Sequence, residues 1–103
     1  MIGRIWHGWT APDDADEYQK LLEREVLPGI ERASRGYEGV YVLRRDGGDE
    51  VEFVTLTLWR SIDAIRTLVG DDYERAYVPD AARALLARFD ETSTHYELVI
   101  ESH

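Results

Sequence analysis

Alternation of apolar and polar positions along the chain marks four extended segments. Each is rich in β-branched, aromatic or other apolar residues, and the first and third carry bulky side chains on both sets of alternate positions. Between the second and third lies an Asp-Gly-Gly-Asp turn, which tolerates the positive φ of a tight hairpin. The pattern predicts a strand at each end of the chain and a central hairpin. The segments are residues 2–10, 40–45, 51–59 and 92–101.

Helical spacing of apolar residues follows the first predicted strand. These apolar positions are Ala15, Tyr18, Leu22 and Val26. Asp14 and Glu17 stand three residues apart, which matches a capping box at the start of a helix. Pro28 disfavours helical geometry in the residue before it and cannot donate a backbone hydrogen bond. We therefore expect a helix that begins near Asp14 and ends or kinks at Pro28.

Two further helices are predicted between the hairpin and the last strand. Ser61 is a typical N-cap and Gly70 stands at the expected C-terminal position of one helix, while Pro79 can open a second, shorter one. The apolar positions are Ile62, Ile65 and Val69 in the first and Ala82, Leu85, Leu86 and Phe89 in the second. The element order predicts an α+β, ferredoxin-like domain with a four-stranded antiparallel sheet.

Both faces of the third predicted strand carry apolar side chains, although two helices cover only one face of a sheet. One face has Val51, Phe53, Thr55, Thr57 and Trp59, and the other has Val54, Leu56 and Leu58. A second copy of the same sheet, related by a two-fold axis, would bury the remaining face. We therefore predict a homodimer. The alternative is that this face is a hydrophobic surface for a ligand.

Composition indicates which partners and which cellular location are expected. The 103 residues suit a single domain, spanning residues 1–103. Twelve basic and 21 acidic residues give a net charge of -9, which disfavours nucleic acid and anionic membrane surfaces as partners because both attract basic proteins. No apolar run approaches the roughly 20 residues of a membrane-spanning helix. The absence of cysteine excludes thiolate chemistry and favours a cytoplasmic location.

Three segments carry a resemblance to a known family. They are residues 39–45 (GVYVLRR), 53–61 (FVTLTLWRS) and 95–99 (HYELV). Together they resemble the antibiotic biosynthesis monooxygenase family, and the resemblance covers nearly the whole chain. It implies a dimeric α+β barrel, a fold that carries quinone-forming monooxygenases, heme-degrading monooxygenases, lyases and cyclases.

Members of the family with different oxidative activities use different sets of site residues. Heme-degrading members share a set of three residues, an Asn, a Trp and a His. In this chain only the Trp has a match, Trp59, because the chain has no Asn and the helix that follows Trp59 has no His. Quinone-forming members use Trp, Tyr and Arg, and often Asn, around a phenol. The resemblance therefore favours oxidation without a cofactor. No paired-histidine spacing or calcium-loop pattern occurs, so we expect no metal site.

Histidine supplies the candidate catalytic bases. His7 and His95 are the candidates, because imidazole exchanges a proton near neutral pH. Both lie in predicted strands, so either can line a pocket between sheet and helices. The alternative for each is a histidine that is hydrogen-bonded for structural reasons. We expect His7, Trp59 and His95 to converge on one cavity.

Aromatic and basic residues supply the candidate substrate contacts. Trp6 and Trp59, and also Trp9, can wall a pocket for a planar substrate, although core or interface packing uses large aromatics equally well. The segment after Gly70 has neither a helical nor a strand pattern and contains three further candidates. Tyr73 is a candidate catalytic residue, and Arg75 and Tyr77 are candidate substrate-binding residues. If that segment caps the pocket, these groups can hold substrate oxygens, whereas the alternative is a solvated connection.

The interpretation is a cofactor-independent monooxygenase that uses O2 to oxidise an aromatic, polyketide-like phenol or anthrone to a quinone. Two alternatives stay open at this point. One is a non-oxidative cyclase, isomerase or lyase on the same fold, which oxygen dependence would distinguish. The other is a non-catalytic dimer that binds a small molecule without turnover.

Overall fold

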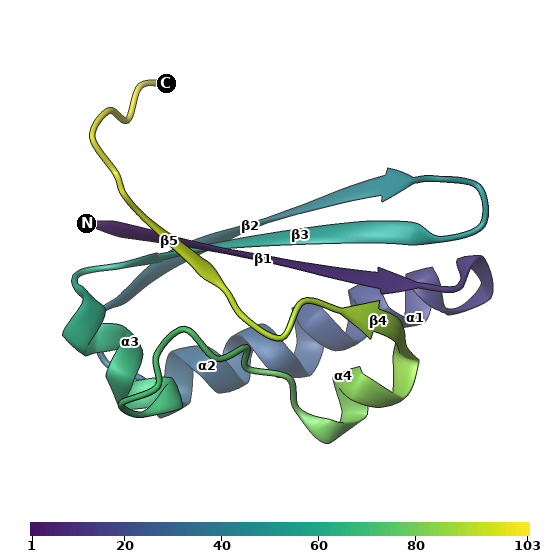
Figure 1. The fold of residues 1–103 in the computed structure, drawn as a ribbon, viewed down its shortest axis with the longest axis horizontal. Coiled ribbons are helices and arrows are strands. Elements are labelled where there is room, and N and C mark those ends of the chain that lie inside the picture. Colours follow the sequence, from purple (N-terminus) through teal and green to yellow (C-terminus); the bar gives the residue numbers. More distant parts are fainter.

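A sheet and a layer of helices form the computed structural model, which describes residues 1–103 (Figure 1). The strands are antiparallel, with β3 between β2 and β1, and with two short strands on the other edge of β1. All the helices lie on one face of the sheet (Figure 1). This confirms the predicted ferredoxin-like α+β class. The strands are β1 (Ile2–Thr10), β2 (Tyr37–Asp46), β3 (Val51–Trp59), β4 (Leu86–Phe89) and β5 (Thr94–Glu97).

The first helical segment continues past Pro28, so of the two expected outcomes, an end or a kink, the end is wrong. A π-helical turn precedes the proline, and the Leu27 N–H donates to the Leu22 carbonyl there. The wider turn accommodates a residue that has no N–H to donate, and the helix then runs on to Ala33. The helical elements are a 3₁₀ turn (Pro12–Asp14), α1 (Ala15–Leu21), the π turn (Leu22–Val26), α2 (Leu27–Ala33), α3 (Ile62–Val69) and α4 (Asp80–Leu85).

Helix caps match the sequence pattern at α3 and differ at α1. The Ser61 hydroxyl accepts a hydrogen bond from the Ala64 N–H at 3.2 Å, and Gly70 ends the helix with a φ of 88°. The Asp14 side chain makes no cap hydrogen bond, so the expected capping box is not formed. The 3₁₀ turn brings the chain into α1 instead.

The predicted hairpin is present, and its turn shows why glycine is needed there. Gly48 has a φ of 91°, in the region that favours glycine. Its N–H donates to a carboxylate oxygen of Asp46 at 3.0 Å, a local bond that closes the turn.

The last predicted strand is shorter than expected, as β5, and an additional strand, β4, precedes it, so five strands take the place of the expected four. β4 pairs with β1 near Gly8, within the segment predicted as the end of the short helix, and β5 pairs with the opposite end of β1 near Arg4. Between them, the chain bonds to the connection between α3 and α4 through the Arg75–Thr92 bridge and the hydrogen bond from the Ala76 N–H to the Glu91 carbonyl. The backbone there is hydrogen-bonded outside the sheet, which separates β4 from β5.

The core lies between the helices and the covered face of the sheet, in two clusters. One cluster packs α1 and α4 against β3, with the edge of the Tyr18 ring against Phe53 at 4.9 Å between centroids. The other packs α2 and α3 around Trp59, which is fully buried. None of the helices combines the length and the apolar character needed to cross a membrane.

Candidate functional site

A small cavity of about 50 Å³ lies between the covered face of the sheet and the helices. Alternate residues of β1 and β3 form its floor, because successive side chains of a strand point to opposite faces. Side chains from α2, α3 and the chain beyond them complete the walls. The lining residues are Arg4, Trp6, Ile30, Thr55, Thr57, Trp59, Leu68, Tyr77 and Ser93. We refer to this space as the inner cavity.

Arg4 is the charged group of the inner cavity. Its side chain is almost fully buried, and none of the ion pairs in the structure involves it. The guanidinium donates to the backbone carbonyls of Tyr73 and, at 2.7 Å, Arg75. Burial lowers the pKa of Arg4 to about 10, so the group stays charged at neutral pH. A buried cation without an anion creates a place where a ligand oxyanion is stabilised.

His95 lies beside Arg4 on the same face of the sheet, since the two residues are paired between β5 and β1. The Nε2 atom is 2.8 Å from a guanidinium nitrogen of Arg4. Because a guanidinium only donates hydrogen bonds, Nε2 accepts and the ring proton is assigned to Nδ1. Burial, and then the charge of Arg4, lower the pKa of His95, against an opposing effect of Glu74. The imidazole is therefore neutral at neutral pH.

Aromatic rings enclose the rest of the inner cavity. The Trp59 N–H donates to the Thr57 hydroxyl at 2.8 Å, which fixes the indole at the end of β3. The Trp6 N–H donates to the Asp90 carbonyl at 2.6 Å, and Tyr77 stands at the rim, 37% exposed. The Thr55 hydroxyl oxygen is buried without a hydrogen-bond partner. The cavity thus contains aromatic surfaces for stacking and one polar atom, the Thr55 hydroxyl oxygen, that is available to a ligand.

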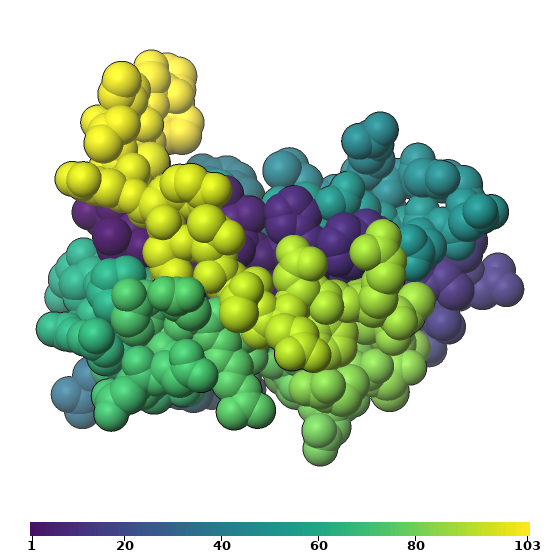
Figure 2. Space-filling view, viewed as in Figure 1, coloured from purple at the N-terminus to yellow at the C-terminus, as the bar shows by residue number.

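The cover of the inner cavity is the connection between α3 and α4, residues 71–79, which we name the strap. Besides its bonds to Arg4, it is tied to the chain after β4, where the Ser93 N–H donates to the Glu74 carbonyl at 2.7 Å. Figure 2 shows the green connection lying directly against the lime to yellow C-terminal part of the chain. The cavity is therefore closed by backbone contacts rather than by a regular element.

Several of the predicted site residues are brought together. Trp6, Trp59 and Tyr77 line the inner cavity. His95 contacts Arg4, and the edge of the Tyr73 ring faces the His95 ring at 5.2 Å between centroids. Arg75 contributes its carbonyl to Arg4, while its side chain lines a neighbouring cavity. Their functional roles stay predictions.

The expected convergence of His7 with Trp59 and His95 is not found. His7 lies on the opposite face of the sheet from Arg4, since odd-numbered and even-numbered residues of β1 point to different faces. There its Nδ1 atom is 2.8 Å from a carboxylate oxygen of Glu52, and its ring stacks with that of Trp9 at 6.0 Å. The sheet therefore separates the two histidines.

Sequence reasoning did not select Arg4, Thr55 or Ser93. A signal for Arg4 was present, because it shares one set of alternate positions with Trp6 and Gly8. That signal is incomplete, since alternation does not tell which set of positions the helices cover.

Comparisons with known proteins support the fold. No protein-family model matches the sequence, and no curated protein matches it. Among solved structures, MhuD, in a mutant form with two manganese protoporphyrin IX molecules bound per active site, is 18% identical with a TM-score of 0.65, covering 100% of this chain and 99% of MhuD. Rv0793 from Mycobacterium tuberculosis is 20% identical with a TM-score of 0.58, covering 99% of this chain and 98% of Rv0793.

Both structures align with this chain over nearly its full length. The chain therefore shares their α+β fold. At this level of identity the likeness concerns the fold alone, and membership of the monooxygenase family stays a prediction.

Proposed function

We propose that the chain is a cofactor-independent monooxygenase that uses O2 to oxidise an aromatic, polyketide-like phenol or anthrone to a quinone. The observation that carries the proposal is the 2.8 Å contact between Nε2 of His95 and Arg4, the charged residue that lines the cavity with aromatic walls. A neutral base beside a fixed cation suits removal of a phenolic proton, because the cation stabilises the anion that forms.

The first step is proton transfer from the substrate to His95. The phenolic oxygen enters between Arg4 and His95, accepts a hydrogen bond from the guanidinium and passes its proton to Nε2. Nε2 thereby exchanges the hydrogen bond from Arg4 for a covalent N–H bond. Because burial and Arg4 lower the pKa of His95, the imidazolium holds this proton weakly and releases it readily later in the cycle.

The second step is reaction of the electron-rich anion with O2. An anthrone reacts as its phenol tautomer, so the proton that His95 takes is one of the two methylene hydrogens. The methylene carbon gains one oxygen atom, and the second oxygen atom leaves as water with the other methylene hydrogen and the proton that His95 returns. The substrate supplies the electrons, so the protein has only to bind and orient it. Trp6 and Trp59 provide faces against which a planar anion stacks.

Substrate entry requires the strap to move. A cavity of about 50 Å³ is smaller than the roughly 150 Å³ that accommodates one benzene ring. Arg4 holds the strap through the carbonyls of Tyr73 and Arg75. A substrate oxyanion competes for the same N–H groups, so binding at Arg4 also loosens the cover. Tyr77 lies at the exposed rim, so its side chain is the first to move aside when substrate enters.

A porphyrin does not fit these residues, although the MhuD structure contains two manganese protoporphyrin IX molecules per active site. Heme iron needs a side-chain ligand such as histidine, and here Nε2 of His95 already accepts from Arg4. The guanidinium would repel a metal ion bound at that nitrogen. No step of the proposed reaction therefore involves a porphyrin.

The open face of the sheet supports the proposed homodimer. Side chains of β1, β2, β3 and β5 that point away from the helices form this face, and Tyr41, Leu43 and Tyr96 are 52%, 60% and 56% exposed. The helices cover only the other face (Figure 1). A two-fold axis brings the same apolar patch of two copies together, which buries it without any other partner. The aromatic substrate, O2 and the cytoplasmic location remain parts of the same proposal.

Oxygen uptake by the purified protein tests the activity. A panel of anthrones and naphthols is assayed in chelator-treated buffer and corrected for spontaneous oxidation. We expect uptake, and we expect His95→Gln to lower kcat by about 100-fold or more, as for loss of a general base. The matched control is His7→Gln, on the opposite face, which leaves kcat unchanged.

Two results would contradict the proposal. One is an uptake no greater than background for the whole panel. The other is an equal loss of activity in both histidine variants. Turnover of the same compounds under argon would instead identify a non-oxidative enzyme.

A further inference from the structure

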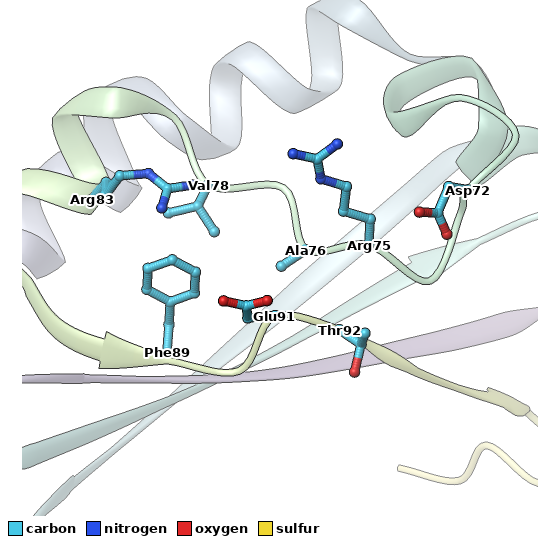
Figure 3. A pocket seen from close by; sticks show the side chains of 8 residues that line it. All are labelled: Asp72, Arg75, Ala76, Val78, Arg83, Phe89, Glu91 and Thr92. Carbon is cyan, nitrogen blue, oxygen red and sulfur yellow. The ribbon is translucent and has the colours of Figure 1, made fainter.

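A second and larger cavity is lined by residues of the strap, α4, β4 and the chain that follows β4 (Figure 3). It encloses about 430 Å³, within the range of roughly 300–1,000 Å³ that holds small organic ligands. We refer to it as the outer cavity. The two spaces adjoin through aromatic rings, since Trp6 lines the inner one and Phe89 lines the outer one, with 6.0 Å between ring centroids. The strap contributes walls to both.

Two arginines line the outer cavity without a carboxylate partner. Arg75 comes from the strap and Arg83 from α4, and neither takes part in an ion pair of the structure. The Arg83 guanidinium lies 4.9 Å from the centroid of the Phe89 ring, which holds it over an aromatic face (Figure 3). Free guanidinium groups bind carboxylates in a bidentate manner, with two parallel hydrogen bonds.

Two acidic residues line the same cavity. They are Asp72, in the strap, and Glu91, whose carboxylate lies beside the Phe89 ring in Figure 3. The cavity therefore does not attract anions in general. It matches a ligand that presents a carboxylate to the arginines and hydroxyl donors to the acids, on an aromatic body that stacks with Phe89.

We propose that the outer cavity binds the carboxylate-bearing end of a hydroxylated aromatic substrate. This inference rests on the proposed function, because the reacting ring of the same molecule lies against Arg4 and His95 in the inner cavity. Trp6 and Phe89 form the shared wall along which the molecule extends. Arg75 and Arg83 thus determine specificity, while His95 and Arg4 act on the reacting ring.

Binding of a matched pair of ligands tests the inference. The probes are a hydroxynaphthoic acid, with its hydroxyl and carboxyl groups on different rings, and the methyl ester of the same acid. Calorimetry gives the Kd of each for the wild-type protein. We expect the acid to bind at least about tenfold more tightly than the ester, because only the acid pairs with the arginines.

Variants locate the effect. Arg75→Gln and Arg83→Gln are each expected to raise the Kd of the acid about tenfold and to leave that of the ester unchanged. Arg35→Gln, another exposed arginine outside both cavities, is the matched control and changes neither Kd. Because all three side chains are exposed, circular dichroism will show the same fold.

The outcomes separate the inference from the proposed function. Equal binding of acid and ester, or no effect of either arginine variant, overturns the inference, while oxygen uptake with His95 dependence still supports the proposed function. Binding of neither compound, together with no oxygen uptake, overturns both. A preference for the acid that Arg35→Gln also abolishes assigns the effect to general surface charge and overturns the inference.

Discussion

Gly8 provides the space in which the Trp6 indole lies. A β-carbon at this position would stand 2.9 Å from the Trp6 ring and 3.0 Å from Leu86, closer than real contacts allow. We expect Gly8→Ala to lower the free energy of unfolding by about 1–3 kcal/mol, the usual cost of overpacking. Urea denaturation measures the change. The variant should also lose affinity for naphthols, because the ring that lines the inner cavity is displaced.

Gly29 is the matched control for this substitution. A β-carbon there has nothing within 4 Å, and the residue lies in the interior of α2. Alanine favours a helix over glycine, so Gly29→Ala should raise the free energy of unfolding by about 0.5–1 kcal/mol. If the two alanine variants change stability in the same direction, the steric role assigned to Gly8 is wrong.

His95 makes stability depend on pH in a defined direction. Its pKa is lowered in the folded protein, first by burial and then by Arg4. The unfolded chain therefore binds the proton more readily, and stability that is present above about pH 6.5 is lost as the pH falls through the lower folded pKa. Urea unfolding at several pH values should show wild type losing stability towards about pH 5 faster than His95→Gln. Parallel curves would exclude this contribution.

The residue types of the site were predictable from sequence, whereas their grouping was not. Tryptophan, tyrosine and histidine were selected as candidates because few other groups in the chain can bind a planar phenol or exchange a proton. Alternation placed His7 and Arg4 on different faces, but the covered face is decided by how α1 and α3 pack. That packing depends on tertiary contacts. The sequence alone therefore did not show that Arg4 lies on the face covered by the helices and His7 on the open face.

At the scale of elements, α3 has the stronger cap. The Ser61 hydroxyl accepts from the Ala64 N–H, whereas the Asp14 side chain makes no cap bond. Ser61→Ala should lower the free energy of unfolding by about 0.5–2 kcal/mol, measured by urea denaturation. Asp14→Ala should cost clearly less, because it removes only a favourable charge at the start of a helix. A larger effect at Asp14 would show that the cap forms in solution after all.

The elements were predictable where one local rule acts alone. β1, the hairpin and α3 follow directly from alternation, from the Asp-Gly-Gly-Asp turn and from Ser61 with Gly70. Two features depend on competing interactions. The helix continues past Pro28 after a π turn, and β4 is separated from β5 because the chain between them bonds to the strap. Neither the backbone adjustment nor the distant partner is visible in a local pattern.

At the scale of the whole molecule, the open sheet face is the feature that the single chain leaves unexplained. Leu43 projects from β2 on this face and is 60% exposed. A lysine there places a charge in the centre of the proposed interface and leaves the core of the subunit untouched, so the fold should persist. Leu43→Lys is expected to raise the Kd of the dimer at least about tenfold, measured by sedimentation equilibrium.

The sign of the net charge makes this experiment decisive. Each chain carries a net charge of -9, so an added lysine reduces the repulsion between two copies and by itself favours association. A weaker dimer can then arise only from burial of the new charge in the interface. Ala33→Lys, exposed at the end of α2, makes the same charge change on the helical layer and should leave the Kd unchanged or lower. If the wild type sediments as a monomer, or if Leu43→Lys associates as tightly as Ala33→Lys, the two-fold sheet interface is wrong and the open face needs another occupant.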